Sequence, residues 1–167
     1  MPDPSSSASE IILTVNTGSS SVRLAAFARE DNAISELANE REGVGACAVP
    51  AKVMLGTFMR THGITHVDVF VHRVVHGGEI LNTSRLLDRK VEAEIDRLGQ
   101  LAPLHNPVSL HWIRAIREAW GGDVRQVAVF DTAFFADLPR VAKTYPIPYA
   151  LSQKYRVRRY GFHGLAH

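Results

Sequence analysis

The sequence has little of several features that would place it in a special class of protein. A single cysteine, Cys47, among 167 residues excludes an intrachain disulfide framework and is typical of a reducing compartment. The net charge is only +2, so charge gives no reason to expect a nucleic-acid or membrane partner. No apolar run approaches the roughly 20 residues of a membrane helix, and residues 1–9 lack the basic and apolar regions of a signal peptide. We therefore expect a cytoplasmic protein.

The remaining composition is that of a folded globular chain. Hydrophobic residues make up 46% and charged residues 22% of the sequence, as in ordinary soluble domains. A chain of this length can bury about two thirds of its unfolded surface, which is enough for a core without disulfides or metals. We interpret residues 1–9 as a flexible lead-in and residues 10–167 as one folded domain.

The apolar pattern predicts short strands that alternate with helices. Apolar, β-branched runs predict strands at residues 11–15, 22–27, 34–38, 67–71 and 126–130. Helical spacing predicts helices at residues 51–60, 88–101 and 106–120, the last with Asn106 as its N-cap and glycines at its end. Residues 132–160 read as loops and short helices. A hairpin followed by alternating helices and strands indicates an α/β fold with a mixed sheet, in which sites form where strands end.

A glycine- and serine-rich turn, residues 16–21, joins the first two predicted strands. Its backbone N–H groups and the hydroxyls of Ser19 and Ser21 could bind an anion, with Arg23 projecting from the next strand. Asn16 could hold a phosphate oxygen or a metal-bound water. The turn lacks the Gly-Lys-Ser/Thr of a P-loop, and a plain polar hairpin turn is the alternative.

Charged and polar side chains also follow two later strands. The pair His72-Arg73 ends an apolar strand, which is costly unless it faces a cleft, and the guanidinium fork suits a carboxylate or phosphate. Asp131 ends another buried strand and could act as a base, a metal ligand or a positioning group. The alternatives are a surface arginine and a carboxylate that caps the next turn.

Two histidines complete the set of candidate side chains. His105 precedes a helix N-terminus, where N–H groups favour anions, and His163 lies between Phe162 and Gly164 near the end of the chain. Each could instead be structural or exposed. Because most of these motifs lie at or beside a strand end, we expect them to line one cleft, with chemistry suited to phosphoryl or acyl transfer to a small anion.

Five segments together resemble the acetate kinase family, in its order and approximate spacing: VNTGSSSVRL, HRVVHGGE, LAPLHNP, VFDTAFF and RRYGFHGLAH. The resemblance extends from Ile11 to His167, and propionate and butyrate kinases share much of the pattern. It implies a ribonuclease-H-like mixed β-sheet flanked by helices, the first domain of the acetate and sugar kinase, Hsp70 and actin fold. It also implies reversible transfer of the γ-phosphoryl group of ATP to acetate, giving acetyl phosphate and ADP, with Mg²⁺ and a homodimeric assembly.

The resemblance further implies roles for single residues. Asp131 and His163 would be catalytic, Asn16 would be associated with magnesium, and Arg23 with the nucleotide. Those implied for the substrate are Arg73 for its carboxylate, Val75, Leu104 and Phe162 for its methyl group, and His105 as a further active-site residue. Because acetate is already a carboxylate, we expect Asp131 to orient the arginine or a magnesium-bound water, and His163 to donate to the transferred phosphoryl group.

The sequence also departs from the family pattern. Thr17 stands where cysteine is common, and Gly-Leu-Ala-His at residues 164–167 replaces Gly-Thr-Ser-His. The family's glycine-rich nucleotide loops, second arginine and magnesium-associated glutamate do not occur in these 167 residues. We therefore interpret the chain as the N-terminal domain of such an enzyme without its nucleotide domain, and expect no appreciable activity from it alone. The alternatives are a free-standing binding half-domain for short-chain carboxylates, a propionate kinase-like fragment without turnover, or a remnant of a truncated gene.

Overall fold

The structure is a computed structural model that describes residues 9–18, 20–43 and 49–167. Its strands are β1 (Glu10–Thr17), β2 (Ser21–Glu30), β3 (Ala33–Gly43), β4 (Val69–Val74), β5 (Arg85–Leu86) and β6 (Arg125–Phe130). Its α-helices are α1 (Ala51–Thr61), α2 (Arg89–Arg97), α3 (Asn106–Trp120), α4 (Arg140–Lys143) and α5 (Tyr149–Tyr155). The 3-10 turns are η2 (Leu98–Gln100), η3 (Asp131–Phe135) and η4 (Gly164–Ala166). Residues 1–8 of the lead-in predicted over residues 1–9, and the candidate residue Ser19, lie outside the described residues.

The described strands form one mixed sheet in the order β3-β2-β1-β4-β6-β5. Strands β1, β2 and β3 pair antiparallel, β1, β4 and β6 are parallel neighbours, and β5 pairs antiparallel with β6. The expected hairpin and mixed sheet are thus confirmed. Because β1, β4 and β6 run in the same direction, their carboxyl ends meet at one edge of the sheet.

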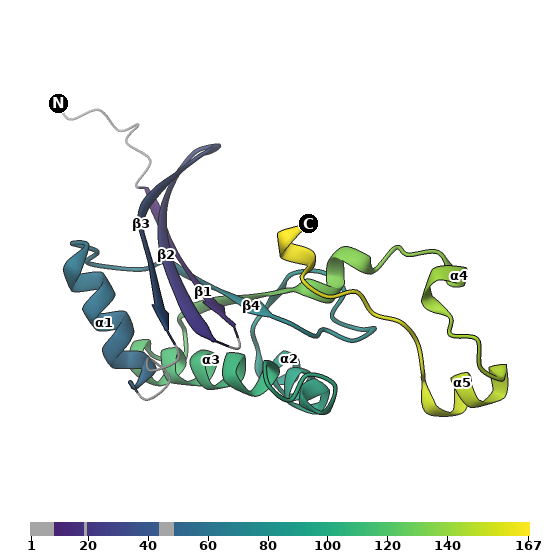
Figure 1. Cartoon of the computed structure of the whole chain (residues 1–167). Coiled ribbons are helices and arrows are strands. Elements are labelled where there is room, and N and C mark those ends of the chain that lie inside the picture. Colours follow the sequence, from purple (N-terminus) through teal and green to yellow (C-terminus); the bar gives the residue numbers. More distant parts are fainter. Residues whose placement is uncertain (1–8, 19, 44–48) are drawn as a thin grey trace.

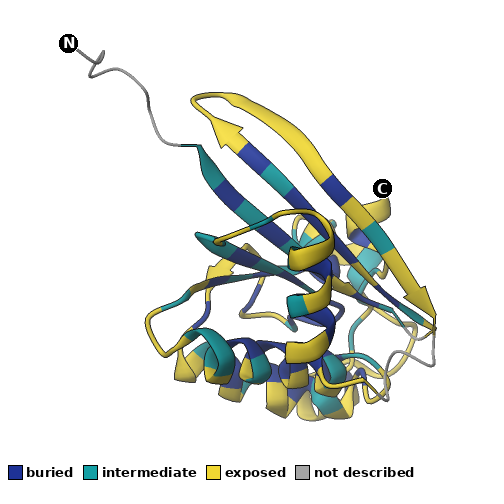
Figure 2. Cartoon of the chain, turned by 90° about the vertical axis from the view of Figure 1, so that its left-hand side faces the viewer, coloured by how far each residue is buried: buried dark blue, intermediate teal, exposed yellow. Residues whose placement is uncertain are grey.

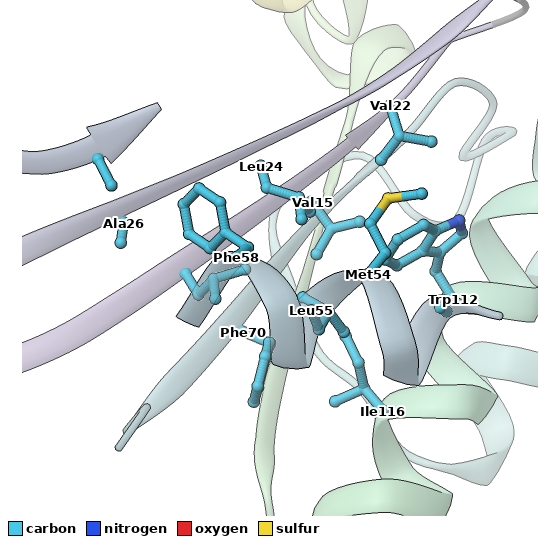
Figure 3. Packing of buried hydrophobic residues seen from close by; sticks show 13 residues of the cluster. Val15, Val22, Leu24, Ala26, Met54, Leu55, Phe58, Phe70, Trp112 and Ile116 are labelled. Carbon is cyan, nitrogen blue, oxygen red and sulfur yellow. The ribbon is translucent and has the colours of Figure 1, made fainter. Parts of the chain in front are cut away.

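Helices α1 and α3 cover one face of this sheet (Figure 1). Successive side chains of a strand point to opposite faces, so only alternate residues reach this core. The strands contribute Leu13, Val15, Val22, Leu24, Ala26 and Phe70, and the helices contribute Met54, Leu55, Phe58, Trp112 and Ile116. Figure 3 shows the α1 side chains inserted between the strands and α3. Each fully buried large side chain contributes roughly 1.5–3 kcal/mol of hydrophobic stabilisation.

The opposite face of the sheet is more open. Along β1 and β4 the residues alternate between buried and partly exposed, and Figure 2 shows this alternation along the strands. The distal part of the β2–β3 hairpin is largely exposed. Side chains on the open face can therefore meet a ligand or another part of a protein.

Several element boundaries differ from the sequence prediction. Strand β4 runs to Val74, beyond the predicted end at residue 71, and β3 extends to Gly43. Helix α2 ends at Arg97 and is followed by η2, whereas one continuous helix was expected over 88–101. The two-residue strand β5 has no pattern that could have predicted it. Strand β4 continues through polar residues because its polar side chains find partners on both faces.

The prediction that Asn106 caps helix α3 is wrong. His105 is the N-cap residue and makes no side-chain capping bond, while Asn106 is the first helical residue and is fully buried. The Asn106 amide accepts from the backbone N of His76 at 3.1 Å and donates to its carbonyl at 2.9 Å and to Ile95 O at 3.3 Å. The side chain thus joins three segments, because buried backbone groups of the loop after β4 need partners more than the helix end does.

The region after η3 contains short helices and loops, as expected. Figure 1 shows α4 and α5 on an arm that extends away from the sheet and then returns. The return brings η4 into contact with η3, at the carboxyl end of β6. Within the described residues, each helix is too short or too polar to cross a lipid bilayer.

Candidate functional site

Three candidate side chains lie where the parallel strands end. Asn16 is on β1, Arg73 is on β4, and Asp131 follows the last residue of β6. The register pairs Val15 with His72 and Arg73 with Val129. Because alternate residues share a face, Asn16, Arg73 and Asp131 all point to the open side of the sheet.

Arg73 and Asp131 form a side-on ion pair. The Arg73 Nε lies 3.1 Å from both carboxylate oxygens of Asp131, and Nη2 lies 2.6 Å from Oδ2. The Asp131 side chain is fully buried and the Arg73 side chain is 17% exposed. A buried carboxylate requires such a partner, so this pair fixes the orientation of the guanidinium. Arg73 is therefore not a free surface arginine, and Asp131 does more than cap the turn that follows it.

The outer edge of the same guanidinium contacts two further candidates. Arg73 Nη1 donates to Oδ1 of Asn16 at 3.2 Å, and Nη2 lies 3.3 Å from Nδ1 of His163. A guanidinium only donates, so Nδ1 of His163 accepts and its proton lies on Nε2. The structure thus brings together Asn16, Arg73, Asp131 and His163, which come from four separate segments of the chain.

Two close contacts hold the segment that carries His163. A Cβ atom at Gly164 would overlap the carbonyl oxygen of Asp131, and one at Gly161 would overlap the ring of Phe135. Glycine at both positions lets the chain pack directly on η3. His163 itself has a φ of 57°, the left-handed conformation that non-glycine residues rarely adopt. Such strain is often found at functional sites, where the surrounding structure holds it in place.

His72 does not face this cluster. Its ring lies on the helix-covered face, where Nε2 is 2.8 Å from Oε1 of Gln126. Burial lowers the pKa of His72 to about 4, so the imidazole is neutral at neutral pH. Of the pair that was expected to face a cleft, only Arg73 does so, because adjacent strand residues point in opposite directions.

The residues expected around the substrate methyl group differ widely in how far they are exposed. Val75 is buried, Leu104 is 73% exposed and Phe162 is 48% exposed. Phe162 borders a cavity of about 570 Å³ together with His76 and Tyr160. Burial lowers the pKa of His76, whose ring packs edge-on against Tyr160 at a centroid distance of 4.6 Å. The described residues do not close an apolar pocket around Arg73.

The remaining candidates lie beside the cluster. His105 is at the start of α3, and its Nδ1 is buried without a hydrogen-bond partner among the described residues. Arg23 is exposed on β2 directly opposite Asn16. The Ser21 hydroxyl accepts a 3.0 Å bond from Nε of Arg41, and the Gly18 N–H donates to the Ser21 carbonyl at 2.8 Å. The first bond ties Ser21 to β3, and the second joins the two ends of the turn.

The described residues contain no cluster of acidic, cysteine or histidine side chains that would hold a metal ion by itself. Among residues 9–18, 20–43 and 49–167, no three His, Cys, Asp or Glu side chains converge on a point that could hold a metal ion. The amide oxygen of Asn16 accepts from the cationic Arg73, which would repel a cation at that atom. Magnesium, and the role of Asn16 beside it, therefore stay predictions from the family resemblance.

Sequence reasoning missed two hydroxyl groups that support the cluster. The Ser109 hydroxyl on α3 donates to the Arg73 carbonyl at 3.1 Å and lies 3.1 Å from the Thr17 hydroxyl. The Thr132 hydroxyl accepts from the N–H of Gly77 at 2.9 Å. Both residues are buried, and each ties a strand end to a neighbouring segment. A lone serine in a helix and a threonine after Asp131 give no sequence signal for these roles.

Comparisons with known proteins agree on one family. The sequence model of the Acetokinase family matches residues 50–167. The acetate kinase of Arthrobacter sp. (strain FB24) is 39% identical over 171 residues, which cover 94% of this chain and 44% of that protein. The acetate kinase of Helicobacter acinonychis (strain Sheeba) is 50% identical over 101 residues, covering 60% of this chain and 25% of that protein.

Solved structures give the same result. The crystal structure of Porphyromonas gingivalis acetate kinase matches with a TM-score of 0.77 and 32% identity, covering 95% of this chain and 46% of that one. A propionate kinase from Francisella tularensis matches with a TM-score of 0.73 and 30% identity, with the same coverage. The chain thus spans a quarter to just under half of the length of these relatives. The shared fold confirms the expected mixed sheet of the acetate kinase type, and the chain belongs to the acetokinase family.

Proposed function

We propose that this chain forms the acid-binding side of an acetate kinase. The reaction is the reversible transfer of the γ-phosphoryl group of ATP to acetate, giving acetyl phosphate and ADP. The observation that carries the proposal is the Arg73 guanidinium, which Asp131 holds in a defined orientation at the open edge of the sheet. A planar donor fork at such a position suits the recognition of a small carboxylate.

The available edge of Arg73 defines how the acid binds. Asp131 occupies the Nε and Nη2 side, so an acetate ion takes the Nη1 and Nη2 edge. Asn16 and His163 contact that edge at 3.2 and 3.3 Å, and both side chains are exposed. Acetate therefore displaces these two groups from Arg73, which leaves them free to contact the phosphoryl group instead. Both acetate oxygens then accept from Nη1 and Nη2, in an end-on pair of hydrogen bonds.

Asp131 acts in this proposal as a positioning residue. Acetate is ionised at neutral pH because its pKa resembles that of a carboxyl side chain, so no base is needed. One acetate oxygen attacks the γ-phosphorus atom, and the bond from that phosphorus to the β–γ bridging oxygen breaks. The electron pair leaves with ADP, and no proton is transferred. Asp131 keeps Arg73 aligned while this in-line displacement takes place.

His163 is the donor to the transferred group. Before acetate binds, Nδ1 of His163 faces Arg73 and the ring proton lies on Nε2, the atom that we propose donates to an equatorial phosphoryl oxygen once acetate has displaced the ring from Arg73. The strained backbone at His163 supports a positioned role. Arg23 and the hydroxyls of Ser21 and Ser19 remain the proposed nucleotide contacts. The Nδ1 atom of His105, which is buried and has no hydrogen-bond partner among residues 9–18, 20–43 and 49–167, supports a place for it near the substrate. Mg²⁺, the homodimer and a cytoplasmic location stay predictions.

In this proposal the preferred acid depends on three apolar residues. Val75, Leu104 and Phe162 are the proposed contacts of the methyl group, and one methylene in such a pocket changes affinity by about 1–3 kcal/mol. The similarity to a propionate kinase keeps propionate as a second substrate candidate. A comparison of kcat/KM for acetate and propionate distinguishes the two.

The test distinguishes an effect on acetate binding from an effect on ATP binding. In the full-length gene product, we expect Arg73→Ala to raise the KM for acetate about tenfold or more and to leave the KM for ATP within about threefold. Arg73→Lys keeps a cation beside the buried Asp131, so it protects the fold while removing the fork. Arg97→Ala, an exposed arginine on α2, is the control. Equal losses for both substrates, or a protein that forms no acetyl phosphate, would contradict the proposal, and acetate binding without turnover would favour a binding half-domain.

A further inference from the structure

Four polar residues form a row across the open face of the sheet. The strand register places Arg41 of β3 opposite Arg23 of β2, and Arg23 opposite Asn16 of β1. The next neighbour is Arg73 of β4, because β1 and β4 pair Val15 with His72 one position earlier. Directly paired residues point to the same face, so the row is continuous from β3 to β4.

The end of the row formed by Arg23 and Arg41 carries two positive charges. Two arginines directly opposite each other on neighbouring strands repel, which destabilises the pair. Among the described residues, neither Arg23 nor Arg41 has an acidic partner within 4 Å, whereas Arg73 has Asp131. The acids that flank Arg41 belong to the other face, where Glu40 contacts His62 at 2.7 Å. A bound anion is the partner that this arrangement lacks.

Arg41 is also held in position. Its Nε donates to the Ser21 hydroxyl at 3.0 Å, which leaves both terminal nitrogens available for a ligand. Arg29 provides the contrast, because it lies on the same face of β2 at the opposite end of the sheet and contacts Glu10 at 3.2 Å. The two ends of this face therefore differ: one holds paired charges, and the other holds cations next to the candidate site.

We propose that Arg41 is a phosphate-binding residue and that the phosphate chain of the nucleotide lies across β1, β2 and β3. The inference rests on the function proposed above. The terminal phosphoryl group lies beside Arg73 and His163, and the diphosphate extends toward Arg23 and Arg41. Neighbouring strands are about 4.8 Å apart, so long arginine side chains on adjacent strands can reach successive phosphates. The leaving diphosphate then moves toward β3, away from the acid on Arg73.

The experiment uses binding as well as activity. ADP and inorganic tripolyphosphate are titrated by calorimetry into the protein and into three variants: Arg41→Gln, Ser21→Ala and Arg29→Gln. Arg41→Gln keeps a donor for the Ser21 hydroxyl and removes the charge together with the two terminal nitrogens that would contact the phosphate. We expect it to weaken both ligands about three- to tenfold at low salt and to reduce the salt dependence of binding. Acetate affinity should not change.

The other variants separate binding from structure. Ser21→Ala removes the bond that holds Arg41 and the proposed Ser21 contact with the nucleotide but keeps the arginine charge, so binding should weaken while its salt dependence stays close to that of the wild type. Arg29→Gln removes a charge from the same face and should leave ADP binding unchanged. Equal binding by wild type and Arg41→Gln, or an equal loss in Arg29→Gln, would overturn the inference. A full-length gene product that binds ADP but forms no acetyl phosphate would contradict the proposed function, whereas the comparison of ADP binding between wild type and Arg41→Gln would still decide this inference.

Discussion

The Nδ1 atom of His163 lies 3.3 Å from Nη2 of Arg73, although 90 residues separate them in the chain. The contact places an imidazole acceptor against a guanidinium whose other side is filled by Asp131. His163 can hold this position only because its segment packs tightly on η3. The site therefore depends on backbone packing as much as on the polar side chains themselves.

Gly164→Ala should disrupt this packing. The added Cβ would overlap the Asp131 carbonyl and lie 2.6 Å from Cβ of Phe134, so the segment must shift and carry His163 away from Arg73. We expect kcat to fall about 100-fold, as small displacements of catalytic groups do. Gly122→Ala is the control, since its added Cβ would contact nothing within 4 Å. Unchanged turnover in Gly164→Ala would show that His163 has no part in the reaction.

Asp131→Ala should destabilise the fold as well as the site. The change leaves the Arg73 guanidinium, which is only 17% exposed, without its carboxylate partner. We expect the free energy of unfolding, measured with urea, to fall by about 3 kcal/mol. Glu94→Ala is the control, because Glu94 pairs with Arg97 at the same distance of 2.6 Å but the Arg97 side chain is exposed. This change should have a much smaller effect. Similar losses in the two variants would argue against a special role for burial.

Asn106→Ala should be costly although the residue lies at a helix start. The backbone N–H and carbonyl of His76 and the carbonyl of Ile95 would lose their partner in the interior. We expect a loss of about 2–3 kcal/mol in the free energy of unfolding. Asn82→Ala, at an exposed asparagine, should change it by less than about 0.5 kcal/mol. A loss of the same small size for Asn106 would mean that these backbone groups find other partners.

His72 should make stability depend on pH below neutrality. Its pKa is about 4 in the folded chain, against 6.5 for an ordinary histidine, because burial disfavours the charged ring. The unfolded state then binds the proton more readily, so stability is complete above pH 6.5 and falls as the pH drops toward 4. The loss should reach about 3 kcal/mol. In urea titrations at several pH values, His72→Leu should lack this component, and an unchanged slope would exclude His72 as its source.

The sequence predicted the main elements of the fold because apolar runs carry most of that information. The hairpin of β1 and β2, the central strands and helix α3 follow from it. The length of β4 and the role of Asn106 do not, because both depend on partners elsewhere in the fold. His76 competes for the Asn106 side chain and outweighs its preference for capping.

The candidate residues could be named from their motifs, but their geometry could not. Which edge of Arg73 faces Asp131 depends on the register between strands 58 residues apart. Arg41 carried no motif at all, and only the pairing of β2 with β3 places it beside Arg23. The exposure of Leu104 could not be predicted either, because the sequence alone does not show whether an apolar loop residue is buried or exposed.

The parallel arrangement of β4 and β6 has a consequence for how the chain is made. Arg73 leaves the ribosome 58 residues before Asp131, which at roughly 5–20 residues per second is an interval of about 3 to 12 s. During that time the guanidinium has no carboxylate, and β4 has no neighbour on the side of β6. Parallel pairing over such a separation forms slowly, because a long loop must close first. The nascent chain thus leaves one edge of the hydrophobic strand β4 unpaired until β6 has been synthesised.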